Sequence, residues 1–120
     1  MVIYIAGKIT GDPNYKKKFA KAKRELYDLL KDDYENVTII NPAELPEGLT
    51  PRDYMHFSFD AIDAADFIAV LPDAHDSAGA RLELQYIEYT GQHDKLTDKP
   101  FERGKHERVS KTRGRKARSV

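Results

Sequence analysis

The sequence predicts an α/β protein of three layers, in which a parallel sheet lies between helices in a doubly wound arrangement. Short apolar runs alternate with longer segments of helical periodicity over residues 2–91, in the order βαβαβα. Loops that contain glycine or proline separate these elements, and each helix has a residue that favours a helix terminus. Because this order requires crossover connections, we expect parallel strands with right-handed crossovers.

The first unit is a strand over residues 2–6 and a helix that starts at Asp12-Pro13. The segment VIYIA is nearly all apolar, as in a strand that is buried on both faces. Asp12 is expected to cap the helix, and Pro13 suits its first position because an N–H there has no helical partner. The lysines at 16–18 are expected to lie largely on the solvent faces. The apolar stripe comprises Phe19, Ala22, Leu26, Leu29 and Leu30.

The second unit is a strand over residues 37–40 and a helix from Thr50 to about Ala65. The strand ends at an Asn-Pro pair, and a loop with two prolines and a glycine follows it. Thr50 is expected to cap the helix, with Pro51 in its first position and Asp53 in its third.

The third unit is a strand over residues 67–71 and a helix over residues 80–90. Asp76 or Ser77 is expected to cap this helix, and Gly91 is expected to stop it. No internal repeat interrupts the alternation.

Length and composition restrict the classes of protein that this chain can represent. A chain of 120 residues has room for one hydrophobic core. The absence of cysteine excludes disulfides, thiolate metal sites and cysteine nucleophiles. Neither of the longest apolar runs could span a bilayer, and no signal peptide is apparent, so we expect a cytoplasmic protein that does not enter a membrane.

The charges divide the chain into an acidic domain, residues 1–91, and a basic tail, residues 92–120. The domain has ten Lys or Arg against sixteen Asp or Glu, and the tail has ten against four. Residues 103–118 contain eight basic side chains and one acid, interrupted by glycine and serine. We expect this tail to be flexible in isolation. It is a candidate for nonspecific binding of nucleic acid, because its cations could neutralise phosphates.

Glu83 is the carboxylate that the third helix places among apolar residues. At about 100° per residue it falls between Tyr86 and Ile87, in an apolar arc that also contains Leu82 and Tyr89. A buried carboxylate without a partner costs several kcal/mol, so the position favours a functional group. Two alternatives are partial solvation at the first turns of the helix and pairing with a distant basic residue.

Two loops with glycine follow strands, and both are therefore expected at the carboxyl edge of the sheet, where ligands bind in such folds. In the loop of residues 7–11, glycines could aim backbone N–H groups inward, with Lys8 beside them. In the loop of residues 72–79, the Ser77 hydroxyl and Gly79 precede a helix N-terminus, which is a natural phosphate seat. Each loop could equally be a structural turn.

The remaining polar candidates are less specific. Asp73 could meet a ribose hydroxyl, whereas Asp66 at a strand start is more typical of a turn or cap. His75 and Asp76 have no partners at the spacing of metal ligands, so we expect no metal.

Three motifs together resemble the nucleoside 2-deoxyribosyltransferase-like superfamily, and within it a short branch of uncharacterised domains that is frequent in bacteriophages and prophages. They are YIAGKITG at 4–11, INPA at 40–43 and DSAGARLE at 76–83, and the resemblance covers residues 2–91. It implies a Rossmann-like or flavodoxin-like domain, truncated here at its C-terminal edge, which acts without a cofactor. It also implies cleavage of the N-glycosidic bond of a deoxynucleoside or its 5′-monophosphate, by hydrolysis or transfer to another base, and a homodimer or higher homo-oligomer.

The same resemblance implies roles for individual residues. Glu83 matches the nucleophile that attacks C1′ of the sugar, and Tyr4 matches a tyrosine beside the sugar and that glutamate. Ser58 stands where the better-studied enzymes carry an aspartate that handles the leaving base, and Asp60 is the nearest acid. The residues that match the positions holding a 5′-phosphate are Gly7, Lys8, Ile9, Thr10, Gly11, Ser77 and Gly79.

Two other functions remain open at this point. The first is a nucleotide-binding or sensing module that keeps the phosphate loops without catalysis. The second is an accessory protein that associates with nucleic acid through residues 103–118.

Overall fold

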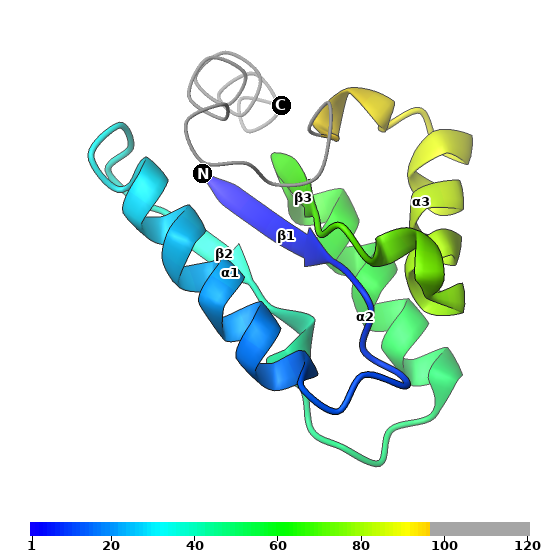
Figure 1. The fold of residues 1–120 in the computed structure, drawn as a ribbon. Helices are drawn as coiled ribbons and strands as arrows, with labels where there is room; N and C mark the ends of the chain where they lie inside the picture. Colours follow the sequence, from blue (N-terminus) through cyan, green and yellow to red (C-terminus); the bar gives the residue numbers. More distant parts are fainter. Residues whose placement is uncertain (97–120) are drawn as a thin grey trace.

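Three parallel strands form the central sheet in the order β2-β1-β3 within residues 1–96, the part of the chain that the computed structural model describes. The strands are β1 (Val2–Ala6), β2 (Thr38–Ile40) and β3 (Phe67–Val70). Helix α1 (Tyr15–Leu30) covers one face of the sheet, and α2 (Pro51–Ala64) and α3 (Ala78–Tyr89) cover the other (Figure 1). The predicted three-layer α/β class is therefore confirmed.

The central strand β1 pairs with a neighbour on each side. Ile3 lies in register with Ile39 of β2 and with Phe67 of β3, and both pairings are parallel. This position explains the unbroken apolar run of β1, because both of its edges and both of its faces are covered. The carboxyl ends of all three strands consequently meet at one edge of the sheet.

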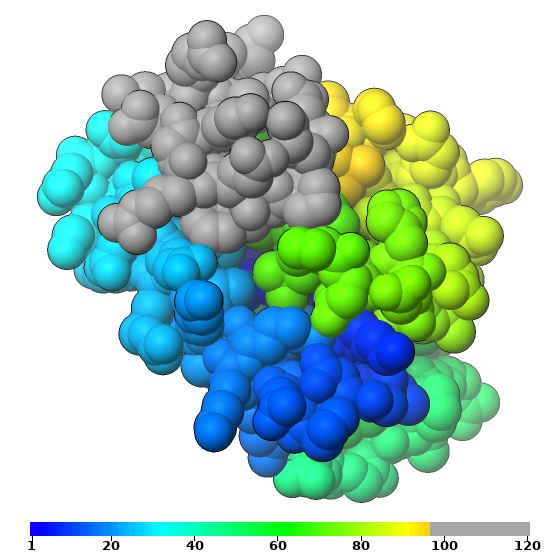
Figure 2. Space-filling model, viewed as in Figure 1, coloured from blue at the N-terminus to red at the C-terminus, as the bar shows by residue number. Residues whose placement is uncertain are grey.

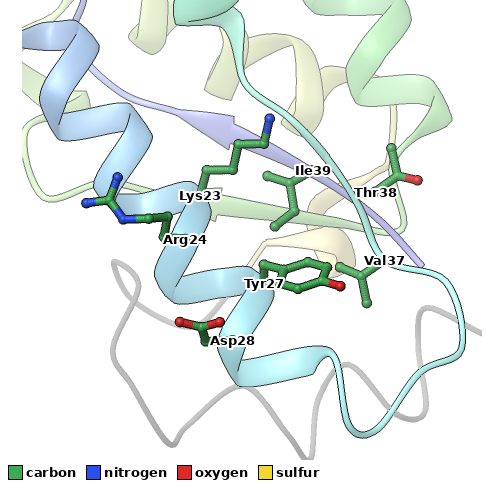
Figure 3. A pocket seen from close by; sticks show the side chains of 7 residues that line it. All are labelled: Lys23, Arg24, Tyr27, Asp28, Val37, Thr38 and Ile39. Atoms are coloured by element: carbon green, nitrogen blue, oxygen red, sulfur yellow. The ribbon is translucent and has the colours of Figure 1, made fainter.

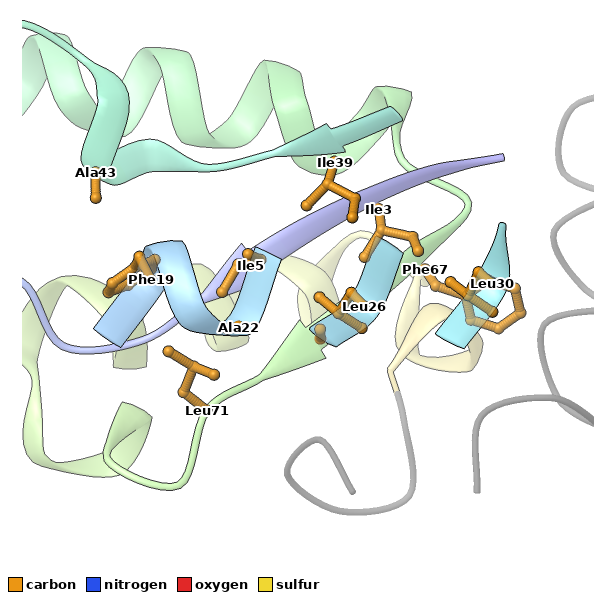
Figure 4. Packing of buried hydrophobic residues seen from close by; sticks show 11 residues of the cluster. Ile3, Ile5, Phe19, Ala22, Leu26, Leu30, Ile39, Ala43, Phe67 and Leu71 are labelled. Carbon is orange, nitrogen blue, oxygen red and sulfur yellow. The ribbon is translucent and has the colours of Figure 1, made fainter. Parts of the chain in front are cut away.

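Alternation along β1 divides the core between the two faces of the sheet. Ile3 and Ile5 point toward α1 and pack with Phe19 and Leu26 (Figure 4). Tyr4 and Ala6 belong to the opposite cluster, with side chains of α2 and α3. The side chain of Tyr4 is therefore directed toward α2 and α3.

The expected caps are present at two of the three helices, although α3 begins at Ala78, two residues before the expected start. Thr50 and Asp53 form a reciprocal capping box at α2, and Ser77 accepts a hydrogen bond from the N–H of Ala80 at α3. Gly91 follows α3 with a positive φ of 75°, as a helix stop requires. The predicted start of the first helix is wrong, because α1 begins at Tyr15 rather than Pro13.

The physical reason for the later start of α1 lies in Asp12. Its carboxylate accepts the N–H of Asn14 at 2.9 Å, which forms a turn before the helix, and its second oxygen binds Lys18. The residue predicted to cap the helix thus shapes the loop that precedes it.

Residues 92–96 contact the folded core. Leu96 forms an isolated parallel bridge with Ile68 of β3, and Lys95 donates hydrogen bonds to the backbone oxygens of Ile62 and Asp63 at the end of α2. The described unit thus extends five residues beyond the boundary expected at residue 91, and the basic segment 103–118 lies outside the described residues. No helix within residues 1–96 is long and apolar enough to cross a membrane.

Candidate active site

Glu83 lies on the buried face of α3 and is only 5% exposed. Ala80 and Ile87 share that face with it. Part of the apolar arc expected from the sequence is wrong, because Leu82 is 44% exposed and Tyr89 is 93% exposed. The carboxylate therefore lies inside the buried face of α3, as expected, but that face is narrower than the sequence indicated.

The group that contacts Glu83 is a hydroxyl and not a cation. The hydroxyl of Tyr4 donates to Oε2 of Glu83, and Oγ of Ser58 lies 3.0 Å from the same phenolic oxygen. Tyr4 is fully buried and Ser58 is 4% exposed. One side chain each from β1, α2 and α3 thus forms this polar cluster, which we call the Tyr4–Ser58–Glu83 triad.

Burial sets the ionisation of the triad. It raises the pKa of Glu83, and the hydrogen bonds from Tyr4 and Ser58 offset this only in part. Burial, with the adjacent Glu83 carboxylate, raises the pKa of Tyr4 well above its ordinary value. Tyr4 consequently stays a neutral donor, and Glu83 is the acceptor that its proton stabilises.

The triad lines a cleft of about 740 Å³ at the carboxyl edge of the sheet. That volume is within the range of pockets that enclose small molecules. Figure 2 shows the face on which the loop after β1 meets the segment after β3, dark blue beside yellow-green. An apolar wall completes the cleft, formed by Pro42, Ala43, Leu45, Leu49, Pro51, Tyr54, Met55 and Leu82.

The N-terminus of α3 supplies hydrogen-bond donors to this cleft. Ser77, Ala78 and Gly79 all line it. The N–H of Ala80 is bound to Oγ of Ser77 at 3.2 Å, whereas the N–H groups of Ala78 and Gly79 have no acceptor within residues 1–96. Two unpaired donors at a positive helix end favour an anion.

The loop after β1 forms the opposite side of the cleft. Gly7, Lys8, Ile9 and Thr10 line the cleft, while Gly11 turns the chain with a φ of 87°. A Cβ at Gly7 would lie 2.7 Å from Cδ1 of Leu71, so a side chain at this position would require Leu71 to shift. Both loops therefore contribute residues to one cleft, but Gly11 is not among them.

Two candidates from the sequence lie elsewhere. Asp60 is exposed on α2 and is not among the residues that line the cleft. Asp73 does not line the cleft either, because its carboxylate binds Lys18 and the N–H of Lys8. Asp66 is 1% exposed and accepts the N–H of Val2 at 2.8 Å, which agrees with its expected structural role.

Sequence reasoning missed Lys18 and the apolar wall. Lys18 was placed with the solvated lysines of α1, but its ammonium lies between three acceptors behind the cleft. The wall comes largely from residues 42–55. The prolines and leucines of this segment predicted a loop and a helix start, but they did not indicate a ligand site. Within the described part of the chain, no three His, Cys, Asp or Glu side chains converge as metal ligands would.

A second hollow of about 530 Å³ lies between α1 and the edge strand β2 (Figure 3). It is lined by Lys23, Arg24, Tyr27, Asp28, Val37, Thr38 and Ile39. None of its titratable side chains is buried. The first cleft, in contrast, is lined by the buried Tyr4 and Glu83.

The fold and the cleft define an α/β protein with a buried carboxylate at the carboxyl edge of a parallel sheet. The chain belongs to the family described as Domain of unknown function (DUF4406), which matches residues 1–94. This match includes every residue of the triad and of both loops. No curated protein and no solved structure matched the chain.

Proposed function

We propose that this protein cleaves the N-glycosidic bond of a deoxynucleoside 5′-monophosphate or of the parent deoxynucleoside, with Glu83 as the nucleophile. The observation that carries the proposal is the buried Glu83 carboxylate, which accepts the Tyr4 hydroxyl in a cleft that also presents the free N–H groups of α3. A resemblance to the nucleoside 2-deoxyribosyltransferase-like superfamily in three motifs supports the same chemistry.

In the first step, an oxygen of Glu83 forms a bond to C1′ as the bond from C1′ to the base nitrogen breaks. The base leaves with that electron pair and takes a proton, and the sugar remains on the enzyme as a glycosyl ester. Water or a second base then attacks C1′ and releases the carboxylate. A glutamate in an apolar site has little hydration to lose before this attack, and Tyr4 fixes its orientation.

The two loops account for a phosphate at the other end of the substrate. The N–H groups of Ala78 and Gly79 and the hydroxyl of Ser77 line the cleft beside Lys8. A 5′-phosphate at this position would face backbone donors, a helix dipole and a nearby cation. We therefore expect monophosphates to bind more tightly than the corresponding nucleosides.

Ser58 bears on a second candidate function. Its hydroxyl lies by Tyr4 in the triad, at the position where the resemblance to the superfamily implies an aspartate, so it cannot supply the leaving base with a carboxylic-acid proton. This observation favours a module that binds a nucleotide without cleaving it. In the catalytic proposal, Ser58 orients Tyr4, and the departing base is protonated by water.

The experiment that tests the proposal is a chromatographic assay for free base. The protein is incubated with a panel of deoxynucleosides and their 5′-monophosphates, beside Glu83→Gln and the exposed control Glu35→Gln. Release by the native protein and the control, but not by Glu83→Gln, supports glycosidic cleavage. If no member of the panel yields base while a monophosphate still raises the melting temperature, the binding module is correct and the catalytic proposal is wrong.

A further inference from the structure

Lys18 joins the two loops of the cleft although they are far apart in the sequence. Its ammonium donates to the backbone oxygen of Lys8 at 2.8 Å, to Oδ2 of Asp12 at 2.6 Å and to Oδ2 of Asp73. An ammonium group has three donors, and each of them has an acceptor here. The first two acceptors belong to the loop after β1, and the third belongs to the segment after β3.

Asp73 completes the connection from the other side. Its Oδ1 accepts the N–H of Lys8 at 3.1 Å, while its Oδ2 binds Lys18. Lys8 is therefore held at both of its backbone polar groups, the N–H by Asp73 and the oxygen by Lys18. The backbone oxygen of Asp73 also accepts the N–H of Asp76, in the short turn that leads to Ser77.

This ion cluster lies behind the cleft and does not line it. The side chains of Lys18, Asp12 and Asp73 are 27%, 20% and 29% exposed, so solvent screens their attraction only in part. Partial burial acts to lower the pKa of Lys18, but the bonds to Asp12 and Asp73 outweigh it and raise the pKa. The pKa of Asp12 is in turn lowered, chiefly by its hydrogen bond with Lys18, so Lys18 and Asp12 both stay charged at neutral pH.

We propose that Lys18 is a positioning residue that holds the loop of residues 7–12 and the segment of residues 72–79 at the separation required to bind one phosphate group between them. The identity of the ligand rests on the proposed function, whereas the coupling of the loops rests on the contacts alone. Lys18 acts through the backbone of Lys8 and through Asp73, without touching the substrate.

Hydrogen–deuterium exchange tests the coupling in the full chain without any ligand. Lys18→Met and Asp73→Asn are compared with native protein and with Lys17→Met, which replaces an exposed neighbour on the same helix. We expect both cluster variants to accelerate amide exchange about tenfold or more in both loops, with β1 and α2 unchanged. Faster exchange in only one of the two loops, or equally fast exchange throughout the domain, would overturn the proposal.

Calorimetric titration with the four deoxynucleoside 5′-monophosphates and their parent nucleosides tests the consequence for binding. Lys18→Met is expected to weaken monophosphate binding about tenfold and nucleoside binding less than about twofold, with Lys18→Arg restoring part of the loss. An equal loss of affinity for monophosphates and nucleosides would mean that Lys18 only stabilises the fold, and it would refute the positioning role. If native protein binds both classes equally, the phosphate assignment of the proposed function fails, and the exchange measurement still decides the coupling.

Discussion

Replacing Tyr4 with Phe removes the hydroxyl that donates to Glu83 and keeps the ring that packs in the core. Tyr4 is fully buried, and Glu83 is 5% exposed, so water cannot readily replace the lost donor. A hydrogen bond to a charged group contributes about 1.5–3 kcal/mol to stability. We therefore expect Tyr4→Phe to lower the free energy of unfolding by about 2 kcal/mol at neutral pH, which corresponds to a melting temperature lower by roughly 8 °C.

The same substitution changes how Glu83 titrates. The Tyr4 hydrogen bond favours the ionised carboxylate and lowers its pKa against the larger effect of burial, which raises it. Without the hydroxyl, the pKa of Glu83 rises further. The loss of stability is consequently small at acidic pH, where Glu83 is protonated in both proteins, and it grows as pH rises through the pKa of Glu83.

Carbon-detected NMR of the glutamate carboxyl groups measures this pKa directly, and thermal melts at several pH values measure the stability. Tyr86→Phe is the matched control, because it removes a tyrosine hydroxyl that binds Asp63 on an exposed surface. A pKa of Glu83 that is unchanged or lower in Tyr4→Phe would refute the reasoning about the triad. So would a loss of stability that does not depend on pH.

Four further predictions concern the site and the fold. Glu83→Gln should become more stable relative to native protein as pH rises above 4.5, and thermal melts at several pH values test this. The reason is that burial raises the pKa of Glu83 in the folded state, so the unfolded chain ionises at a lower pH than the folded protein. Gly7→Ala should cost about 1–3 kcal/mol in denaturant unfolding, since its Cβ would lie 2.7 Å from Leu71, and Leu71→Val should relieve part of that cost in the double variant. Thr50→Ala should cost about 1 kcal/mol through loss of the α2 capping box, and an equal unfolding midpoint would contradict that. A chain that ends after Leu96 should keep its fold and its small-molecule binding but lose any nucleic-acid binding. Circular dichroism measures the fold and filter binding measures the nucleic-acid affinity. Retained nucleic-acid binding would disprove a role for the basic segment.

The fold was predictable because each of its signals is local. An apolar run for β1, a capping box at Thr50 and a glycine stop at Gly91 need only a few neighbouring residues, and the structure confirms all three. The burial of Glu83 was also predictable from helical periodicity. The burial of the residues around Glu83 was less predictable, because periodicity alone does not distinguish a buried residue such as Ile87 from the exposed Leu82.

The partners inside the site depend on contacts between distant segments. Tyr4 and Glu83 are separated by 79 residues, and only the family resemblance placed them together in advance. Lys18 and Asp73 are 55 residues apart, and no local pattern distinguishes Lys18 from the solvated lysines beside it. Asp12 was misread for a different reason, because two local partners, the N–H of Asn14 and the ammonium of Lys18, engage the carboxylate that was expected to cap the helix.

The most direct test of the account is mass spectrometry of the protein quenched during turnover of the best substrate in the panel. We predict a covalent adduct with the mass of one deoxyribosyl or phosphodeoxyribosyl group on the peptide that contains Glu83, absent from Glu83→Gln. Release of base with an adduct on another residue, or undiminished release by Glu83→Gln, would contradict the role of Glu83 as the nucleophile.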